Sequence, residues 1–266
     1  MSLPAESTAR PAGDPVGVRL DRDGPVATVT LCRPEVLNAQ TPQMWSALRD
    51  IGRQLAGDLR VVVVRGDGRS FSAGLDLSLV SPDHPDTFLT ELATLPDSRA
   101  QERIAAFQEA FSWLRRADLI TVAAVRGHAI GAGFQLALAC DLRILADSAQ
   151  LAMAEVSLGL VPDLGGTKRL VELVGYARAL EICVTGRRVG AAEAARFGLA
   201  NLVVPDADLD AATADLVTAI LAAPRDAVVE VKALLSAAAG RDFAGQEAAE
   251  RAAQVRRIRD LAGLGD

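Results

Sequence analysis

The sequence contains little cysteine and almost no histidine. Its 266 residues include three cysteines and two histidines. Cys32, Cys140 and Cys183 lie in apolar surroundings at spacings that fit neither a zinc site nor a disulfide framework, so we interpret them as buried thiols in a reducing compartment. His84 lies close to prolines and His128 lies beside Gly127, and neither has a cysteine close by in the sequence. We therefore expect neither a metal site nor a histidine-based catalytic triad.

The chain also lacks an excess of positive charge and a long apolar run. Its formal net charge of −6 argues against a nucleic-acid partner, although a local basic patch for a phosphorylated ligand stays open. No apolar segment approaches the roughly 20 residues that cross a bilayer, so no membrane partner is expected. Residues 1–15 are rich in Pro, Ala and Ser, which predicts a flexible N-terminal tail and not a signal peptide. Together these features predict a soluble, cytoplasmic protein.

A repeated order of strand, glycine loop and helix indicates an α/β fold. Residues 16–33 predict a β-hairpin around the turn DRDGP, and Thr41 is predicted to cap a helix that ends near residue 57. The runs LRVVVVRG and LITVAAVRG are uniformly apolar, as buried parallel strands are. We predict one α/β core over residues 16–205, followed by a helical C-terminal region over residues 206–266.

Two glycine loops each follow a predicted buried strand and precede a helical segment. They are FSAGLDL at residues 71–77 and GAGFQ at residues 131–135. Ligands of parallel sheets bind beyond the carboxyl ends of the strands, and the first N–H groups of a helix have no intrahelical partner. Two such N–H groups aimed at one point would bind an oxyanion. Either loop alone is better explained as a turn, and neither matches a dinucleotide or Walker phosphate motif.

Taken together, five segments resemble the enoyl-CoA hydratase/isomerase (crotonase) family in their order and spacing. They are LCRPEVLNA, VVVVRGDGRSFSAGLDL, AAVRGHAIGAGFQLALACDLRIL, AEVSLGLVPDLGGTKRLVELVG and ALEICVTGRRVGAAEAARFGLANLVVP. The resemblance implies a crotonase-like spiral of ββα units. It also implies an acyl-CoA substrate held by its thioester in a two-amide oxyanion hole, and a homotrimer or a dimer of trimers assembled through the C-terminal helices. Coenzyme A is then part of the substrate, so no separate cofactor is expected.

The resemblance also implies roles for particular residues. The oxyanion-hole donors would be the backbone N–H groups of Leu75 and Ala132, where alanine is tolerable because only the backbone acts. Arg33 or Arg69 could bind the CoA phosphates, but either could equally be a surface charge. Residues 81–98 would cover the acyl pocket. The residues implied in substrate binding are Val36, Leu37, Ala39, Ala73, Gly74, Asp76, Leu77, Gly131, Gly133 and Ala154.

The candidate acids separate two chemistries. Hydratase relatives use two glutamates; here Glu155 matches the second, but Gln135 stands at the first and cannot transfer a proton as a carboxylate does. A single acid suffices to move a proton between two carbons, which favours double-bond isomerisation over hydration. Asp163 matches an acid of some isomerase-type relatives, or is a turn residue. An apolar pocket would raise the pKa of Glu155.

Several alternatives stay open. Gln135 could be an amide donor to the thioester or to Glu155, or only a polar residue at a helix start. The protein could be a hydratase, or it could bind acyl-CoA without turnover. A serine hydrolase of the related Clp-type fold would need a Ser–His pair, for which only His84 and His128 are available.

Overall fold

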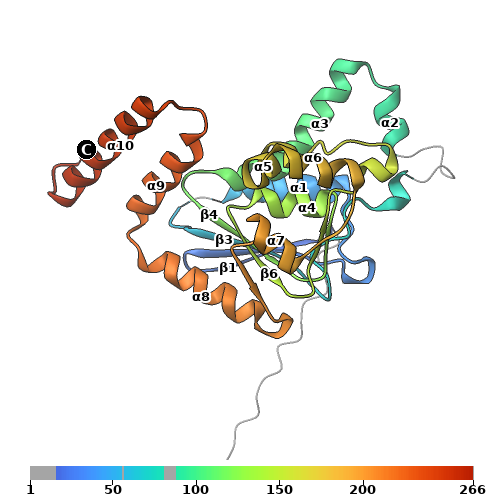
Figure 1. Cartoon of the computed structure of the whole chain (residues 1–266), viewed down its shortest axis with the longest axis horizontal. Helices are drawn as coiled ribbons and strands as arrows, with labels where there is room; N and C mark the ends of the chain where they lie inside the picture. Colours follow the sequence, from blue (N-terminus) through green and yellow to red (C-terminus); the bar gives the residue numbers. More distant parts are fainter. Residues whose placement is uncertain (1–15, 56, 81–87, 266) are drawn as a thin grey trace, which may run out of the picture.

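The computed structural model describes residues 16–55, 57–80 and 88–265 (Figure 1). The tail predicted over residues 1–15, residue His84 and the first part of the 81–98 stretch lie outside the described residues. Across the part that is described, no helix is both long enough and apolar enough to span a bilayer.

A six-stranded sheet forms the centre of the protein, in the order β1-β2-β3-β4-β6-β9. The first two strands pair antiparallel, with Val18 opposite Leu31, and form the predicted hairpin. The remaining neighbours pair parallel. The strands are β1 (Val18–Asp23), β2 (Val26–Leu31), β3 (Val61–Gly66), β4 (Ile120–Val125), β6 (Leu142–Ala146) and β9 (Leu202–Val204).

The inner strands are apolar throughout because helices cover both faces of the sheet. Val62 and Val64 of β3 pack into the larger core, whereas Val61 and Val63 pack into a second core. In Figure 1, α1, α4, α5 and α6 lie on one face of the sheet and α8 runs along the other. Burial on both faces explains the uniform valine run, and the predicted α/β fold with buried parallel strands is confirmed.

The helices on the larger core begin and end close to the predicted positions. Thr41 caps α1, since its Oγ1 accepts a hydrogen bond from the Met44 N–H at 3.3 Å, and Pro42 occupies the first turn. The helices are α1 (Pro42–Gln54), α2 (Phe88–Thr94), α3 (Asp97–Ser112), α4 (Ala132–Ala139), α5 (Gly166–Val174), α6 (Tyr176–Thr185) and α7 (Ala191–Phe197). Short 3-10 turns are η1 (Pro34–Val36), η2 (Leu77–Val80), η3 (Trp113–Arg115), η4 (Glu155–Leu158) and η5 (Asp206–Asp208).

A second, three-stranded sheet positions the two segments that matter most for the site. Its strands are β5 (His128–Ile130), β7 (Gln150–Ala152) and β8 (Val189–Gly190), in the order β5-β7-β8. β5 and β7 run parallel, and the Gly131 N–H donates to the Ala152 carbonyl oxygen at 2.8 Å. The chain leaves β5 into α4 and leaves β7 into η4. The residues after both strands therefore emerge side by side.

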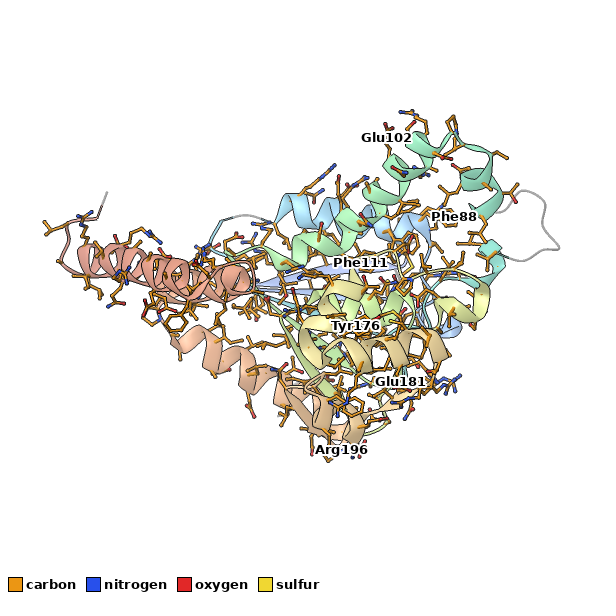
Figure 2. All side chains as sticks on the ribbon, turned by 45° about the horizontal axis from the view of Figure 1, so that its top comes forward. Phe88, Glu102, Phe111, Tyr176, Glu181 and Arg196 are labelled. Carbon is orange, nitrogen blue, oxygen red and sulfur yellow. The ribbon has the colours of Figure 1, made fainter. Side chains whose placement is uncertain are left out.

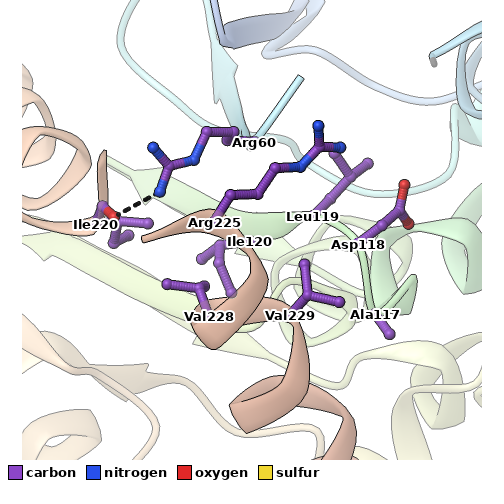
Figure 3. Close-up of a pocket in the computed structure, with 9 residues that line it drawn as sticks. All are labelled: Arg60, Ala117, Asp118, Leu119, Ile120, Ile220, Arg225, Val228 and Val229. Atoms are coloured by element: carbon purple, nitrogen blue, oxygen red, sulfur yellow. Dashed lines mark hydrogen bonds between the residues drawn. The ribbon is translucent and has the colours of Figure 1, made fainter. Parts of the chain in front are cut away.

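The C-terminal region consists of α8 (Leu209–Ala222), α9 (Arg225–Ala238) and α10 (Phe243–Leu261). Arg60 fixes the end of α8 by donating to the carbonyl oxygens of Ile220, Leu221 and Ala223. Figure 3 shows the bond to Ile220. The space at this junction is only about 10 Å³, which is enough for a single water, so it is a packing seam between helix and sheet. Beyond it, α9 and α10 project away from the sheet (Figure 1).

Candidate active site

The two glycine loops lie against each other. The Ser72 N–H donates to the His128 carbonyl oxygen at 2.7 Å, and the Ile130 N–H donates to the Ser72 carbonyl oxygen at 3.0 Å. Gly74 adopts φ +90°, and a Cβ built on it would lie 2.5 Å from the Ile130 carbonyl oxygen and 3.7 Å from the Ala132 nitrogen. Glycine is needed at residue 74 both for its backbone conformation and for this close approach.

Leu75 and Ala132 present backbone N–H groups that donate to no acceptor among the described residues. Ala132 is the first residue of α4, where an N–H has no intrahelical partner. Leu75 differs from the expectation, because it lies in an extended segment that bridges to Gln40 and not at the start of a helix. Only the four-residue turn η2 follows it. The helix dipole can therefore favour an anion at Ala132 but not at Leu75.

Both residues line one cavity of about 410 Å³. Its wall is mostly apolar and includes Trp45, Phe88 and Phe107, whose rings pack together with centroid distances of 5.0–6.2 Å. Figure 2 labels Phe88, which α2 contributes to this wall. The sequence-predicted residues on the wall are Ala73, Gly74, Leu75, Leu77, Gly131, Ala132, Gln135, Ala154, Glu155 and Asp163.

The other predicted substrate-binding residues lie off this wall. Val36 and Leu37 belong to the turn before α1, and Ala39 is buried. Gly133 packs against Ser72, whose carbonyl oxygen would lie 2.6 Å from an added Cβ. The role of Gly133 in this structure is therefore close packing.

Asp76 forms an ion pair with Arg33 at 3.0 Å. Arg33 also donates to the Ala39 carbonyl oxygen at 2.8 Å, so it ties residues 37–40 to residues 73–76. Burial acts to raise the pKa of Asp76, but hydrogen bonds from Ser78 and Arg33 together bring it below its ordinary value. Arg69, the other phosphate candidate, is exposed at the surface.

Glu155 carries one carboxylate oxygen with a partner and one without. Its Oε1 accepts from the Gln135 side-chain amide at 2.7 Å, whereas its Oε2 is buried and has no hydrogen-bond partner among the described residues. Gly131 lies directly beside the carboxylate, because an added Cβ would stand 3.4 Å from Oε1. Burial raises the pKa of Glu155, and the negative charge of Asp163 adds to this; the backbone of Glu155 itself and the hydrogen bond from Gln135 oppose it.

Gln135 is a buried residue of α4 and is 1% exposed. Its Oε1 accepts from the backbone N–H groups of Leu164 at 2.9 Å and Gly166 at 3.2 Å. Together with its bond to Glu155, it joins α4, η4 and the start of α5. Sequence analysis could not find the Leu164 and Gly166 N–H groups, because backbone donors leave no signal in residue type.

Asp163 lies on the cavity wall, in the loop before α5. Burial raises the pKa of its carboxyl group. The Gln108 side-chain amide donates to the Asp163 backbone carbonyl oxygen at 2.6 Å, which fixes the loop without engaging the carboxylate. A second carboxyl group thus faces the same cavity as Glu155.

Two further residues support the site. Trp45 donates its indole N–H to the Gln40 side chain at 2.8 Å and also lines the cavity. Asn38 adopts φ +56° and donates through its side-chain amide to the Asp67 and Ser70 carbonyl oxygens. Its position in the LNA motif was the available signal, since asparagine tolerates the left-handed conformation.

A Ser–His contact exists, but it does not form a hydrolase site. The Ser70 hydroxyl lies 3.1 Å from His128 Nδ1. The other ring nitrogen faces Arg188 at 3.5 Å and not a carboxylate. Ser70 is 1% exposed and lies off the cavity wall. Burial, and then the charges of Arg188 and Arg69, lower the pKa of His128. The arrangement lacks both the acid and the accessible nucleophile that a triad requires.

Comparison with known proteins identifies the family. The sequence profile described as enoyl-CoA hydratase/isomerase matches residues 21–260. The chain belongs to the enoyl-CoA hydratase/isomerase family. It is similar to a Thermobifida fusca YX protein assigned as an enoyl-CoA hydratase and solved in complex with CoA. That similarity amounts to 51% identity over 93% of this chain and 95% of the other, with a TM-score of 0.87. The crotonase-like fold expected from the resemblance is thereby confirmed.

Curated members of the enoyl-CoA hydratase/isomerase family carry names from both reactions. A Mycobacterium bovis protein assigned as an enoyl-CoA hydratase is 34% identical over 72% of this chain and 70% of its own length. A mitochondrial Delta(3,5)-Delta(2,4)-dienoyl-CoA isomerase of Dictyostelium discoideum is 31% identical over 69% of this chain and 63% of its own length. Membership of the family therefore leaves hydration and isomerisation to be distinguished by the site itself.

Proposed function

We propose that this protein is an enoyl-CoA isomerase that moves a carbon–carbon double bond along an acyl-CoA thioester. One observation carries the proposal: a single cavity holds two free backbone donors beside Glu155, whose Oε2 is buried without a partner. The position that would supply a second glutamate is the neutral amide of Gln135. A substrate with a thioester fits because its carbonyl oxygen would accept from both N–H groups.

The reaction follows from these positions. The Leu75 and Ala132 N–H groups would donate to the thioester oxygen of a 3-enoyl-CoA, and Glu155 would take a proton from C2. The electron pair of the broken C–H bond stays with the substrate and forms an enolate, whose negative charge lies mainly on that oxygen. Glu155 then returns the proton to C4, and the double bond lies between C2 and C3. A raised pKa suits a carboxyl group that must both accept and return a proton.

The substrate would be an enoyl-CoA with an apolar acyl chain. Trp45, Phe88 and Phe107 line the cavity with aromatic rings, which favours an alkyl chain over a charged group. The solved relative in complex with CoA supports the CoA portion of this substrate. The reaction needs no cofactor, because CoA belongs to the substrate and no electrons are transferred.

Hydration of a 2-enoyl-CoA is the second candidate. It is favoured by the second carboxyl group in the cavity, since Asp163 could share with Glu155 the task of holding and activating a water. The hydratase names of relatives point the same way. The two readings differ in the acid they require: isomerisation needs only Glu155, whereas hydration needs both.

The test is to supply 3-enoyl-CoA and 2-enoyl-CoA separately. The proposal expects 3-enoyl-CoA to become conjugated and 2-enoyl-CoA to gain water slowly or not at all. Glu155→Gln should abolish conjugation, and Asp163→Asn should largely preserve it. Rapid water addition that Asp163→Asn abolishes would favour the hydratase. Tight binding of acyl-CoA by calorimetry with no turnover of either substrate would instead indicate a non-catalytic binder.

We propose in addition that the chain assembles as a homotrimer or a dimer of trimers through α9 and α10. Several large apolar side chains on these helices are exposed in the single chain: Val231, Leu235, Val255, Ile258 and Leu261. Burying them against other copies would remove an apolar surface that a monomer would leave in water. Light scattering of the full chain tests this, and a monomer at micromolar concentration would refute it.

A further inference from the structure

The side-chain amide of Gln135 uses its hydrogen-bonding capacity in two directions. Two backbone N–H groups, those of Leu164 and Gly166, point at its Oε1. Two donors can be satisfied only by an oxygen, so the amide nitrogen must be the atom that faces Glu155. The loop at the start of α5 therefore fixes which end of Gln135 meets the carboxylate.

The surrounding residues leave Gln135 no room to turn away. The side chain is 1% exposed. A Cβ built on Gly166 would stand 2.7 Å from Gln135 Cγ, so glycine at residue 166 is what lets the amide sit against the backbone. Packing against Gly166 and the two N–H donors together fix the Gln135 side chain in the orientation that bonds to Glu155.

We propose that Gln135 is a positioning residue that holds the Glu155 carboxylate at the cavity wall through Oε1, and that this role requires an uncharged side chain at residue 135. The proposal rests on the proposed function of Glu155 as the proton carrier. Gln135 itself is not a catalytic residue here, because its polar atoms are engaged with Glu155 and with the backbone.

A comparison with glutamate at residue 135 shows why the side chain there must be uncharged. A glutamate at 135 could accept from Leu164 and Gly166 with one oxygen, but its other oxygen would meet Glu155 Oε1 at about the present 2.7 Å. Two carboxylates at that distance cannot both be ionised, so they would share one proton and titrate as a pair.

The other ionisable groups near Glu155 are Asp163, in the loop before α5, and Cys183, on α6. Burial raises the pKa of Glu155 and that of the Cys183 thiol; the charge of Asp163 adds to the first shift, and the charge of Glu155 adds to the second. The Gln135 amide is a hydrogen-bond donor to Glu155 that stabilises its ionised form. Removing this donor should therefore raise the pKa of Glu155.

The first test compares Gln135→Met with the wild type. Met has a similar shape but no donor, so Glu155 would be free to rotate and a misplaced base should lower kcat by about 10²-fold with little change in KM. The acid limb of the pH–rate profile should move to higher pH. An unchanged kcat and an unchanged acid limb would overturn the proposal.

The second test uses Gln135→Glu, which preserves the shape almost completely. While the pair holds one proton, that proton can replace the amide N–H and activity should persist. When the proton is lost at higher pH, activity should fall, giving an alkaline limb that the wild type lacks. A Gln135→Glu variant that is folded and has the wild-type profile would also overturn the proposal.

A third variant moves Gln135 without changing it. Gly166→Ala should displace the amide and shift the acid limb in the same direction as Gln135→Met, by a smaller amount. Gly190→Ala is the matched control, because its Cβ would meet only the Gln150 side chain at an ordinary 3.5 Å. Equal acid limbs in the two alanine variants would contradict the proposed contact.

Failure of the proposed function would be separable from failure of this inference. If the wild type converts neither enoyl-CoA, the function fails, and Glu155 can still be titrated by infrared difference spectroscopy with Glu155→Gln identifying its signal. A higher Glu155 pKa in Gln135→Met than in the wild type supports the positioning role. The same pKa in both proteins refutes it.

Discussion

Asp141 and Glu155 both lie in the segments that resemble the enoyl-CoA hydratase/isomerase family. Their side chains have very different hydrogen-bond partners. Asp141 Oδ2 accepts from the Thr121 N–H at 2.8 Å, from the Thr121 hydroxyl at 3.0 Å and from the Lys232 ammonium at 2.7 Å. Glu155 accepts one side-chain hydrogen bond through Oε1, and its Oε2 is buried without a partner in the described part of the chain. The charge of Asp141 is paired with that of a lysine, whereas Glu155 has no cationic partner among the described residues.

This difference distinguishes an acid that stabilises the fold from an acid that can take part in a reaction. The bonds of Asp141 attach α9 to the core through Lys232, which is 6% exposed and also donates to the Leu119 carbonyl oxygen. A carboxylate held by a lysine ammonium and two hydrogen bonds from one threonine stabilises the fold and is not free to carry a proton. An acid kept buried and half-satisfied costs stability, and such strain is typical of functional sites.

Glu155→Gln should produce the largest change in activity. Because the carboxylate is the only proton carrier in the proposed reaction, we expect isomerisation to fall by up to about 10⁴-fold. Stability should not fall. The folded-state pKa of Glu155 is raised, so its ionisation destabilises the fold as pH rises past the ordinary value.

The same variant should therefore unfold at a higher temperature than the wild type at pH 7, and the gap should close below about pH 4, where both side chains are neutral. Glu102→Gln, on the surface of α3, is the control for both readouts (Figure 2). A Glu155→Gln variant that is active, or markedly less stable, would show that Glu155 is a structural acid like Asp141.

Gly74→Ala should lower activity next most strongly. The new Cβ would approach the Ile130 carbonyl oxygen to 2.5 Å and force the two loops apart, removing one oxyanion donor at a cost of about 10²- to 10³-fold in kcat. Gly24→Ala serves as the control, since it shares a positive φ but has nothing within 4 Å of the added Cβ. Equal losses in the two variants would mean that backbone strain alone explains the effect.

Asp141→Asn should show the opposite pattern from Glu155→Gln. Breaking a buried ion pair leaves Lys232 charged without its partner, so we expect a loss of about 3 kcal/mol in the free energy of unfolding, measured by urea denaturation. The kcat per folded molecule should stay within about twofold of the wild type, which is far below the range of an acid–base catalyst. Asp50→Asn, whose ion pair with Arg49 is half exposed, should cost little. A large loss of kcat in Asp141→Asn would contradict its structural role.

The smallest effect concerns pH. Since Glu155 must be ionised to accept a proton and its pKa is raised, activity should climb with pH at values above those of an ordinary glutamate. Asp163→Asn removes the neighbouring negative charge and should move this acid limb to lower pH. A pH–rate profile of each protein checks the direction, and an acid limb that moves upward would show that Asp163 does not act on Glu155 through its charge.

Much of the fold could be predicted from residue patterns because those patterns are local. A few neighbouring residues determine the conformation of the valine run in β3, of the Thr41 cap and of the glycine loops. The fully buried state of Gln135 could not be predicted in this way. It depends on backbone N–H groups about 30 residues further along the chain, and these exist at every residue whatever its type.

The donor at Leu75 shows a related limit. Its loop was expected to feed a helix, as the loop before Ala132 does, but it is instead held extended by backbone pairing with residues 37–40. The glycine in each loop correctly indicates that another segment lies too close for a Cβ at that residue. What it cannot report is which distant segment makes that approach.

The most direct measurement is a crystal structure of this protein with a saturated, non-reacting acyl-CoA. We expect the thioester oxygen to lie about 3 Å from both the Leu75 and the Ala132 nitrogens, with Glu155 Oε2 facing C2. A thioester bound with its oxygen away from these two nitrogens, or with Glu155 turned from C2, would contradict the account.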